Sequence, residues 1–527
     1  MSEPVAPLEL DLADLHALLG RAQHVLPPED WRKLQGVVDT LALLTQLLEN
    51  KRTTIARLRQ LLFGVRTEKT RTVFAPPPEP PAQGHRTRTA KGHGRNGAAS
   101  YHGARRIPVA HRWLHRGDAC PECCRGKVYE LPPASRVRVV GQAPVHAERY
   151  DLDRFRCNLC GEVFTASAPQ GVGETKYDET AAGMIALLKY GAGMPFYRLE
   201  GLQQSLGIPL PTSTQWDLAH EASRRLGPVY AELIRQAAQG DIVYNDDTTM
   251  KILELLGPLP PAEPGRANRR GVFTSGIVST RAGARIALFF TGPQHAGENL
   301  AAVLAQRLAE LDRPIQMCDA LSRNLPPALR TLVANCLAHG RRKFVDVATN
   351  FPTECKYVID LLAEVYRHDA LAKQEAMSPH QRLRFHQTHS APVMETLHQW
   401  LVEQQQTHTV EPNSGLGQAI AYLLRHWHKL TLFLRAPGAP LDNNLCERQL
   451  RAVAIGRKNY LFAGSDRAAE RAAILYTVIR TAALAKIDVY AYLVRVLTRI
   501  AEGWPAARLD DLLPENHVPE YASDTTT

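Results

Sequence analysis

The chain has 527 residues, of which 44% are hydrophobic and 22% are charged, a balance that excludes both a disordered tail and a small disulfide-stabilised fold. Lys and Arg (63) exceed Asp and Glu (53), and the formal net charge of +10 favours a polyanionic partner. The acidic N-terminus and the absence of a long uncharged apolar run argue against secretion and a membrane span. Nine cysteines, four of them in two close pairs, suit a reducing compartment, so we expect a cytoplasmic protein.

Residues 1–66 are predicted to form a helical, coiled-coil region. Apolar residues from Leu34 to Leu62 follow the three-four spacing of a heptad seam, with Lys51 as a polar position within it. This pattern fits a coiled coil that joins two copies of the chain. It fits equally a long amphipathic helix that folds back on its own domain.

Residues 67–116 are predicted to form a basic, flexible linker. They include PPPEPP at 76–81, and between Arg71 and Arg116 nine Lys or Arg residues accompany a single acid, Glu79. Such a composition has too little apolar surface to offset the entropy of ordering. The linker can be a plain solvated spacer, but its charge favours an arm that binds phosphates.

Two Cys-x-x-Cys pairs indicate a zinc-binding module over residues 117–170. The four expected ligands are Cys120, Cys123, Cys157 and Cys160. Two such pairs can complete the tetrahedral thiolate shell of one structural Zn²⁺ ion. Alternating residues at 136–139 and 150–156 predict strands that carry the pairs. The alternative is a set of unligated thiols, and the neighbouring Cys124 leaves the choice of ligands open.

Residues 171–238 are predicted to be helical. Two amphipathic stretches, 197–206 and 213–223, are separated by glycine and prolines, and Thr212 or Ser213 is expected to cap the second. The pair indicates either a helix-turn-helix or a plain helical hairpin, because the turn is longer than is usual for the former.

Residues 239–345 are predicted to form the first part of a ribonuclease-H-like core. The expected strands cover residues 242–253, 272–278, 286–291, 314–318 and 333–337. The expected helices cover residues 297–311 and 325–332. In this topology the first and fourth strands are neighbours, which brings Asp246 and Asp319 together. Carboxylates that share two divalent cations about 3.5 to 4 Å apart can stabilise both oxygens of an in-line displacement at phosphorus, but that chemistry needs a third acid.

The rest of the chain is predicted to be helical and to supply that acid. It divides into a helical insertion, a second part of the core, and C-terminal helices with a tail, at residues 346–437, 438–465 and 466–527. Asn443 or Asn444 can begin a helix with Glu447 in its first turn. The spacing also resembles a capping box, so Glu447 can be a cap or a metal ligand. The fold class is therefore multidomain α+β/α/β, with a mixed-sheet core interrupted by helices.

Three stretches carry a resemblance to a known family. NDDTTMKIL (245–253), CLAHGRRKFVDV (336–347) and LDNNLCERQLRAVAIGRKNYLFAGS (441–465) resemble the bacterial transposases of the insertion sequence 66 family. The stretch KYGAGMPFYRLE (189–200) fits as well, and the similarity runs from about Leu34 to Leu497.

The resemblance implies a DDE-type DNA transposase with a ribonuclease-H-like fold. Carried over by position, the acidic triad is Asp246, Asp319 and Glu447, with Asp246 taken in preference to Asp247. The triad would hold two catalytic Mg²⁺ ions, Asp246 bridging them, for strand cleavage at the element's ends and later attack of the freed 3′-hydroxyl on target DNA. The expected partners are double-stranded DNA at the element ends and the target, a second copy of the chain through the N-terminal helix, and helper proteins of the same element. We expect the protein to associate with the nucleoid and not with a membrane.

Basic residues flank the acids in sequence and are expected to bind DNA phosphates: Arg341, Arg342, Lys343, Arg448, Arg451, Arg457 and Lys458. The alternative for each is a salt-bridged surface. Cys336 and His339 are expected to be a buried thiol and a hydrogen-bonded histidine.

Two rival functions remain: a zinc-containing DNA-binding protein without catalysis, and a ribonuclease-H-like nuclease that cuts strands without joining them.

Overall fold

The computed structural model divides into two compact units, Met1–Pro78 and Glu79–Thr527, which are described separately. The structure describes residues 12–22, 26–35, 38, 109–129, 131, 134, 136, 142–156, 158, 160, 163–170, 172, 175–253, 272–327, 331–407, 409–460 and 463–517. In the first unit, α1 (Leu12–Ala22) is followed by a helix over 28–35, and Trp31 Nε1 donates to Leu19 O at 3.2 Å. The predicted heptad seam lies outside the described residues apart from Leu34, so the coiled coil stays a prediction.

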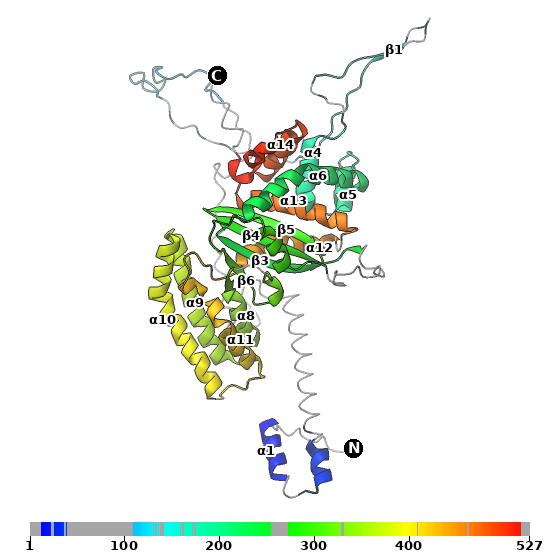
Figure 1. Cartoon of the computed structure of the whole chain (residues 1–527). Coiled ribbons are helices and arrows are strands. Elements are labelled where there is room, and N and C mark those ends of the chain that lie inside the picture. The colour runs from blue at the N-terminus through cyan, green and yellow to red at the C-terminus, as the bar shows by residue number, and fades with distance from the viewer. Residues whose placement is uncertain are drawn as a thin grey trace, which may run out of the picture. The chain divides into compact units, whose positions relative to one another are not determined.

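A five-stranded mixed sheet forms the centre of the second unit (Figure 1). Its strands are β3 (Ile242–Met250), β4 (Val272–Arg281), β5 (Ala284–Gly292), β6 (Ile315–Cys318) and β7 (Leu332–Asn335). They lie in the order β5-β4-β3-β6-β7, with antiparallel pairing among β3, β4 and β5 and parallel pairing of β6 with β3 and β7. The predicted adjacency of the first and fourth strands is confirmed.

Helices cover both faces of this sheet. α6 (Thr212–Ala237), α13 (Asp466–Leu484) and α14 (Val489–Ala501) share one apolar core with β3, β4 and β5. Val243, Ile277 and Leu288 from these strands are fully buried in that core. Because successive strand residues point to opposite faces, Tyr244 and Asp246 face away from Val243, toward α12 (Asn444–Tyr460), which contacts β3 and β4.

Two threonines of α13 accept hydrogen bonds from the outer edge of β5, which is an edge strand of the sheet. The backbone N–H of Ala287 donates to Thr481 Oγ1 at 3.1 Å, and that of Phe289 donates to Thr477 Oγ1 at 2.9 Å. Unpaired backbone groups on a strand edge are otherwise open to pairing with another chain. α13 therefore takes part in the hydrogen bonding of the sheet as well as in its core.

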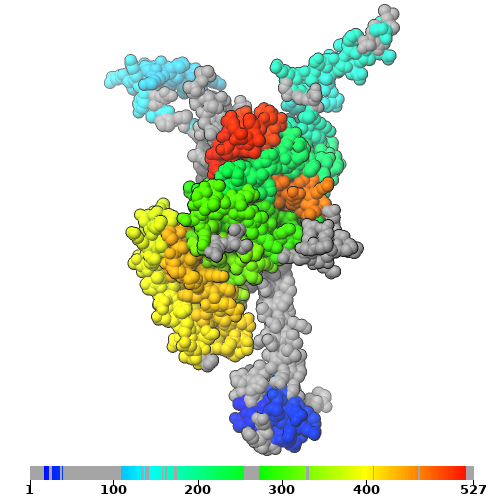
Figure 2. All heavy atoms as spheres, in the orientation of Figure 1, coloured from blue at the N-terminus to red at the C-terminus, as the bar shows by residue number. Residues whose placement is uncertain are grey.

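The segment predicted as a helical insertion is helical in the structure. It comprises α9 (Pro352–Gln374), α10 (Pro379–Gln406), α11 (Gly415–Leu430) and the short η5 (Leu432–Leu434). In the space-filling view its yellow side chains form a continuous mass beside the green sheet (Figure 2). Contacts of α8 (Leu337–Val347) with α9 and α11, and of α11 with β7, join it to the core.

The remaining described elements precede the sheet or close the chain. They are β1 (Arg154–Arg156), β2 (Val163–Thr165), α4 (Glu179–Ala186), η2 (Leu187–Gly191), α5 (Phe196–Ser205), α7 (Ala296–Leu304), η4 (Ser322–Asn324), η6 (Ala506–Leu512) and η7 (Pro514–Asn516). β1 and β2 pair in antiparallel fashion. Of the predicted strand at 136–139 only Arg136 is described, and it lies in no strand.

Two local predictions are wrong. The described part of the helix expected at 325–332 is irregular at 325–327 and 331 and enters β7 at Leu332. Pro326 and Pro327 explain this, since proline lacks the N–H that a helix needs and disfavours helical geometry in the residue before it. α6 is not capped by Thr212 or Ser213, because Pro211 occupies its N-cap without a side-chain hydrogen bond.

Candidate functional site

Asp246 and Asp319 lie at corresponding positions of adjacent strands. β3 and β6 run parallel with Tyr244 paired to Met317, and each aspartate follows two residues later. Asp319 comes directly after β6, and its Oδ1 accepts hydrogen bonds from Leu321 N at 3.1 Å and from Asn324 Nδ2. These bonds fix the direction of the Asp319 side chain at the strand end.

Glu447 approaches from the first turn of α12. The helix docks on the sheet through Cys446, whose thiol donates to the carbonyl of Gly276 at 3.3 Å, and Gly276 is the β4 partner of Asp246. The backbone N–H of Asn443 donates to Cys336 Sγ at 3.3 Å, and that of Asn444 donates to Asp442 Oδ1 at 3.1 Å. Since both N–H groups have these partners, Glu447 does not form the capping box that its spacing allowed.

The charges of Asp319 and Glu447 act on Asp246. Burial, together with the charges of Asp319, Glu447 and Asp247, raises the pKa of Asp246 to about 7 against a hydrogen bond from the Asp247 backbone that lowers it. The three carboxyl groups come from segments far apart in the sequence. The sheet and α12 therefore place these acids within electrostatic range of one another, but their carboxylate oxygens do not all lie within 4.8 Å as the ligand atoms of a compact metal site do.

Asp247 has a different environment from Asp246. Its side chain is 1% exposed and forms ion pairs with His295 Nδ1 at 3.1 Å and with Arg323 at 3.0 Å. His295 precedes α7 and Arg323 lies in η4, on the opposite face of β3 from α12. Asp247 is thus paired with the Arg323 guanidinium and the His295 imidazole, and Asp246 is the aspartate that faces Glu447.

A buried network of amide side chains lies beneath the acids. Asn245 Nδ2 and Gln316 Nε2 both donate to the carbonyl of Asn324 at 2.8 Å, and Gln316 Nε2 also donates to Asn245 Oδ1 at 2.9 Å. Asn443 Nδ2 donates to the carbonyl of Asn245 at 3.2 Å. All four side chains are fully buried. The network connects β3, β6, the turn after Asp319 and the start of α12. It could not be predicted from the sequence, because isolated Asn and Gln residues follow no recognisable spacing.

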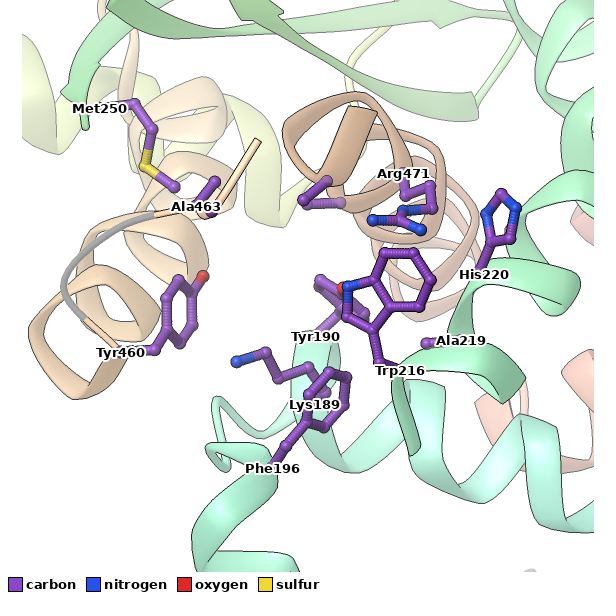
Figure 3. Close-up of a pocket in the computed structure, with 13 residues that line it drawn as sticks. Lys189, Tyr190, Phe196, Trp216, Ala219, His220, Met250, Tyr460, Ala463 and Arg471 are labelled. Atoms are coloured by element: carbon purple, nitrogen blue, oxygen red, sulfur yellow. The ribbon is translucent and has the colours of Figure 1, made fainter. Parts of the chain in front are cut away.

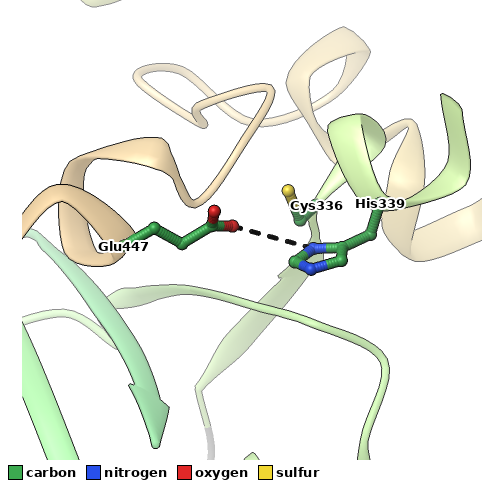
Figure 4. Close-up of side chains that lie close together, drawn as sticks. All are labelled: Cys336, His339 and Glu447. Carbon is green, nitrogen blue, oxygen red and sulfur yellow. Dashed lines mark ion pairs between the residues drawn. The ribbon is translucent and has the colours of Figure 1, made fainter. Parts of the chain in front are cut away.

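A second group of possible metal ligands adjoins Glu447. The ligand atoms of Cys336, His339 and Glu447 lie within 4.8 Å of one another, and His339 Nδ1 is 3.9 Å from Glu447 Oε1 (Figure 4). Cys336 is a buried thiol, as predicted, and burial raises its pKa to about 12. His339 Nδ1 is buried without a hydrogen-bond partner, so the expectation of a hydrogen-bonded histidine is wrong at this nitrogen.

The basic residues expected to bind DNA lie on α8 and α12. Five are exposed: Arg342, Lys343, Arg448, Arg451 and Lys458. Arg341 and Arg457 are half-buried, and Arg457 donates to Thr248 Oγ1 at 3.1 Å at the end of β3. Arg457 is therefore in part a structural residue that joins α12 to the sheet.

The first cysteine pair lies in a tight turn. Ala119 and Lys127 form an antiparallel bridge, and Cys120 N donates to Gly126 O at 2.8 Å. Backbone N–H groups of Arg125 and Gly126 lower the pKa of the Cys123 thiol. Among the described residues only the Cys336 group gathers three possible ligands, so Cys120, Cys123 and Cys160 are not gathered in this way. Cys157 lies outside the described residues, and the four-cysteine zinc site stays a prediction.

Comparison with known proteins shows that this chain belongs to the class of transposases. Residues 175–471 match the model of the Transposase IS66 family, and residues 477–514 match that of the IS66 C-terminal element. The chain therefore belongs to the IS66 family of transposases, and the resemblance noted from the sequence is confirmed.

Two relatives come from Sinorhizobium fredii (strain NBRC 101917 / NGR234). The uncharacterized protein y4jD is 29% identical over 439 residues, which cover 78% of this chain and 82% of that protein. The uncharacterized protein y4hP is 29% identical over 391 residues, which cover 69% of this chain and 66% of that protein. In the part of this chain that the structure describes, no helix is both long enough and apolar enough to cross a bilayer.

Proposed function

We propose that this protein is the DNA transposase of an insertion sequence, and that Asp246, Asp319 and Glu447 are its catalytic, metal-binding acids. The observation that supports the proposal is the position of these acids on β3, directly after the neighbouring strand β6 and in the first turn of α12, near enough for Asp319 and Glu447 to raise the pKa of Asp246. The strand order β5-β4-β3-β6-β7 supports a ribonuclease-H-like core. The family membership supports DNA as the substrate.

The donor set fits magnesium. All three side chains offer carboxylate oxygens, the ligand type that Mg²⁺ prefers, and a few carboxylates leave room for water and phosphate oxygens. Buried carboxylates that repel one another are unfavourable without a cation, and a bound cation would relieve this repulsion. A pair of Mg²⁺ ions would supply Lewis-acid stabilisation of the attacking and leaving oxygens at phosphorus.

The chain's own groups would hold the site and the DNA. The amide network around Asn245 keeps the turn after Asp319 and the start of α12 in place. The exposed cations of α8 and α12, among them Lys343 and Arg448, would bind backbone phosphates on either side of the acids and position the strand.

Three further parts of the proposal concern regions outside the core. Cys120, Cys123, Cys157 and Cys160 would bind one structural zinc ion, and the turn at Cys120 with its N–H groups near Cys123 supports the first half of that site. The N-terminal helix would join two copies of the chain, and helper proteins of the same element would assist. The protein would act at the nucleoid.

The test is cleavage of labelled element ends by the purified protein in Mg²⁺ and in EDTA. We expect metal-dependent nicking at the element boundary, followed by joining to target DNA. Asp246→Asn and Glu447→Gln should abolish both steps and retain DNA binding, whereas Asp312→Asn, an exposed acid outside the site, should leave them unchanged. Undiminished cutting by the two triad variants would show that the triad is wrong. Binding without any cutting favours the non-catalytic DNA-binding protein, and cutting without joining favours the nuclease.

A further inference from the structure

A pocket of about 180 Å³ is bordered by α6 and α13 and includes Tyr460, the last residue of α12 (Figure 3). It is lined by residues from five segments: η2, α5, α6, the end of β3 and the region from α12 to α13. At η2 the regular helix α4 changes to a π-helix, which places Lys189 and Tyr190 at the pocket. Single π-helical turns occur frequently at functional sites.

Aromatic rings and cations alternate around this pocket. The guanidinium carbon of Arg471 lies 3.9 Å from the ring centroid of Trp216. The amino group of Lys189 lies 4.0 Å from the ring centroid of Tyr460 and 4.8 Å from that of Phe196 (Figure 3). Trp216 is nevertheless 44% exposed, so part of its ring remains open for a planar ligand.

The two cations have no acidic partner among the described residues. Arg471 is only 7% exposed, and its Nη2 is buried without a hydrogen-bond partner. Burial lowers the pKa of Lys189 to about 8, the direction expected for an ammonium group without a counter-charge. A buried donor that lacks an acceptor is unfavourable, and an anionic oxygen would satisfy it. The pocket therefore favours an anion and disfavours a cation.

We propose that this pocket binds one unstacked nucleotide of the DNA, with its base against Trp216 and its phosphate beside Arg471 and Lys189. The inference rests on the proposed function and extends it to a second DNA contact. The volume of the pocket is below the roughly 300 to 1,000 Å³ of sites for drug-sized molecules. This limits the ligand to about one ring system and its phosphate. A base within a duplex is stacked on both faces, so only a single-stranded or extruded nucleotide can present a face to the indole.

The test measures binding of the full-length protein to a fluorescently labelled single strand, to an abasic strand of equal length and to a duplex, by fluorescence anisotropy. Loss of base stacking on an aromatic side chain is expected to weaken binding of the single strand by about 5- to 150-fold. Trp216→Ala should show this loss, Arg471→Met should also weaken binding because it removes the phosphate contact, and Trp216→Phe should retain most of the affinity. The abasic strand should bind wild-type protein weakly and should be insensitive to Trp216→Ala.

A matched control is available elsewhere in the chain. Arg499 lies 5.6 Å from the ring centroid of Trp504 but pairs with Glu502, so Arg499→Met removes a similar stacked cation outside the pocket and should not change binding. Because Trp216 is exposed, its replacement should leave the fold intact, and circular dichroism checks this for both pocket variants. If Trp216→Ala and wild-type protein bound the single strand with equal affinity, the inference would be overturned. Duplex binding by both proteins would at the same time leave the proposed function intact. Binding of deoxynucleoside monophosphates without binding of any DNA would assign the pocket to free nucleotides and overturn the DNA assignment.

Discussion

Replacement of Asp246 by asparagine should stabilise the protein at neutral pH while abolishing its activity. Burial, reinforced by the charges of Asp319 and Glu447, raises the pKa of Asp246 from its ordinary value of 3.8 to about 7. Each pKa unit corresponds to about 1.4 kcal/mol, so ionised Asp246 destabilises the metal-free fold by up to about 4 kcal/mol. Asparagine keeps the shape of the side chain and removes the charge.

The sign of the pH dependence follows from the raised pKa. Below about pH 4 Asp246 is protonated in both the folded and the unfolded chain, and it has no effect on stability. Between about pH 4 and pH 7 the unfolded chain releases this proton while the folded chain retains it, so stability falls as the pH rises. Above about pH 7 the full destabilisation is present.

The measurement is urea-induced unfolding of wild-type and Asp246→Asn protein in EDTA at pH 4.5 and pH 8. The variant should exceed the wild type in unfolding free energy by little at pH 4.5 and by up to about 4 kcal/mol at pH 8. Added Mg²⁺ should stabilise the wild type, by about 2.7 kcal/mol at a concentration of 100 times Kd, and the variant much less. Asp312→Asn serves as the control for a general effect of removing an acid.

A difference that is the same at both pH values would refute this reasoning, because it would place Asp246 in solvent, away from Asp319 and Glu447. Equal stabilisation of both proteins by Mg²⁺ would place the magnesium site elsewhere.

Other predictions concern how the site is supported. Thr477→Val and Thr481→Val should each reduce unfolding free energy by about 1 to 3 kcal/mol, since a buried N–H of β5 loses its acceptor, and serine at either position should restore it in the same urea titration. Gly276→Ala places a methyl carbon 2.8 Å from Leu450 of α12; we expect a loss of about 1 to 3 kcal/mol and slower cleavage, and unchanged kinetics would contradict the close docking. His339→Ala should weaken Co²⁺ binding, followed by its absorption spectrum, if the buried nitrogen beside Glu447 accepts a metal.

The sheet could be predicted from the sequence because its strands have clear apolar patterns and its turns are marked by glycine. Once the fourth strand is placed beside the first, Asp246 and Asp319 must meet, and the structure has this arrangement. The position of Glu447 followed from a helix start after Asn443. The sequence could not exclude a capping role for Glu447, because that exclusion depends on Cys336 and Asp442 accepting from the N–H groups of Asn443 and Asn444.

Other features depend on contacts that no local pattern encodes. The amide network joins Asn245, Gln316 and Asn324 through backbone and side-chain oxygens that only the folded sheet brings together. The pocket around Arg471 combines segments separated by more than half the chain. The error at 325–332 has a local cause, because Pro326 and Pro327 break the helix that the apolar spacing around them favours.

The contrast between Asp246 and its neighbour explains why neutral amides support this site. Asp247 is held by the Arg323 guanidinium and the His295 imidazole, and such pairing would compete with a metal ion for the same carboxylate oxygens. Among the described residues Asp246 and Asp319 form no ion pair, so their charges remain available to a cation. Asn324 and Asn245 can fix the geometry around these acids through single hydrogen bonds without neutralising them. The arrangement thus keeps three repelling carboxylates together by the surrounding fold, which is why we expect removal of one charge to stabilise the chain and binding of magnesium to do the same.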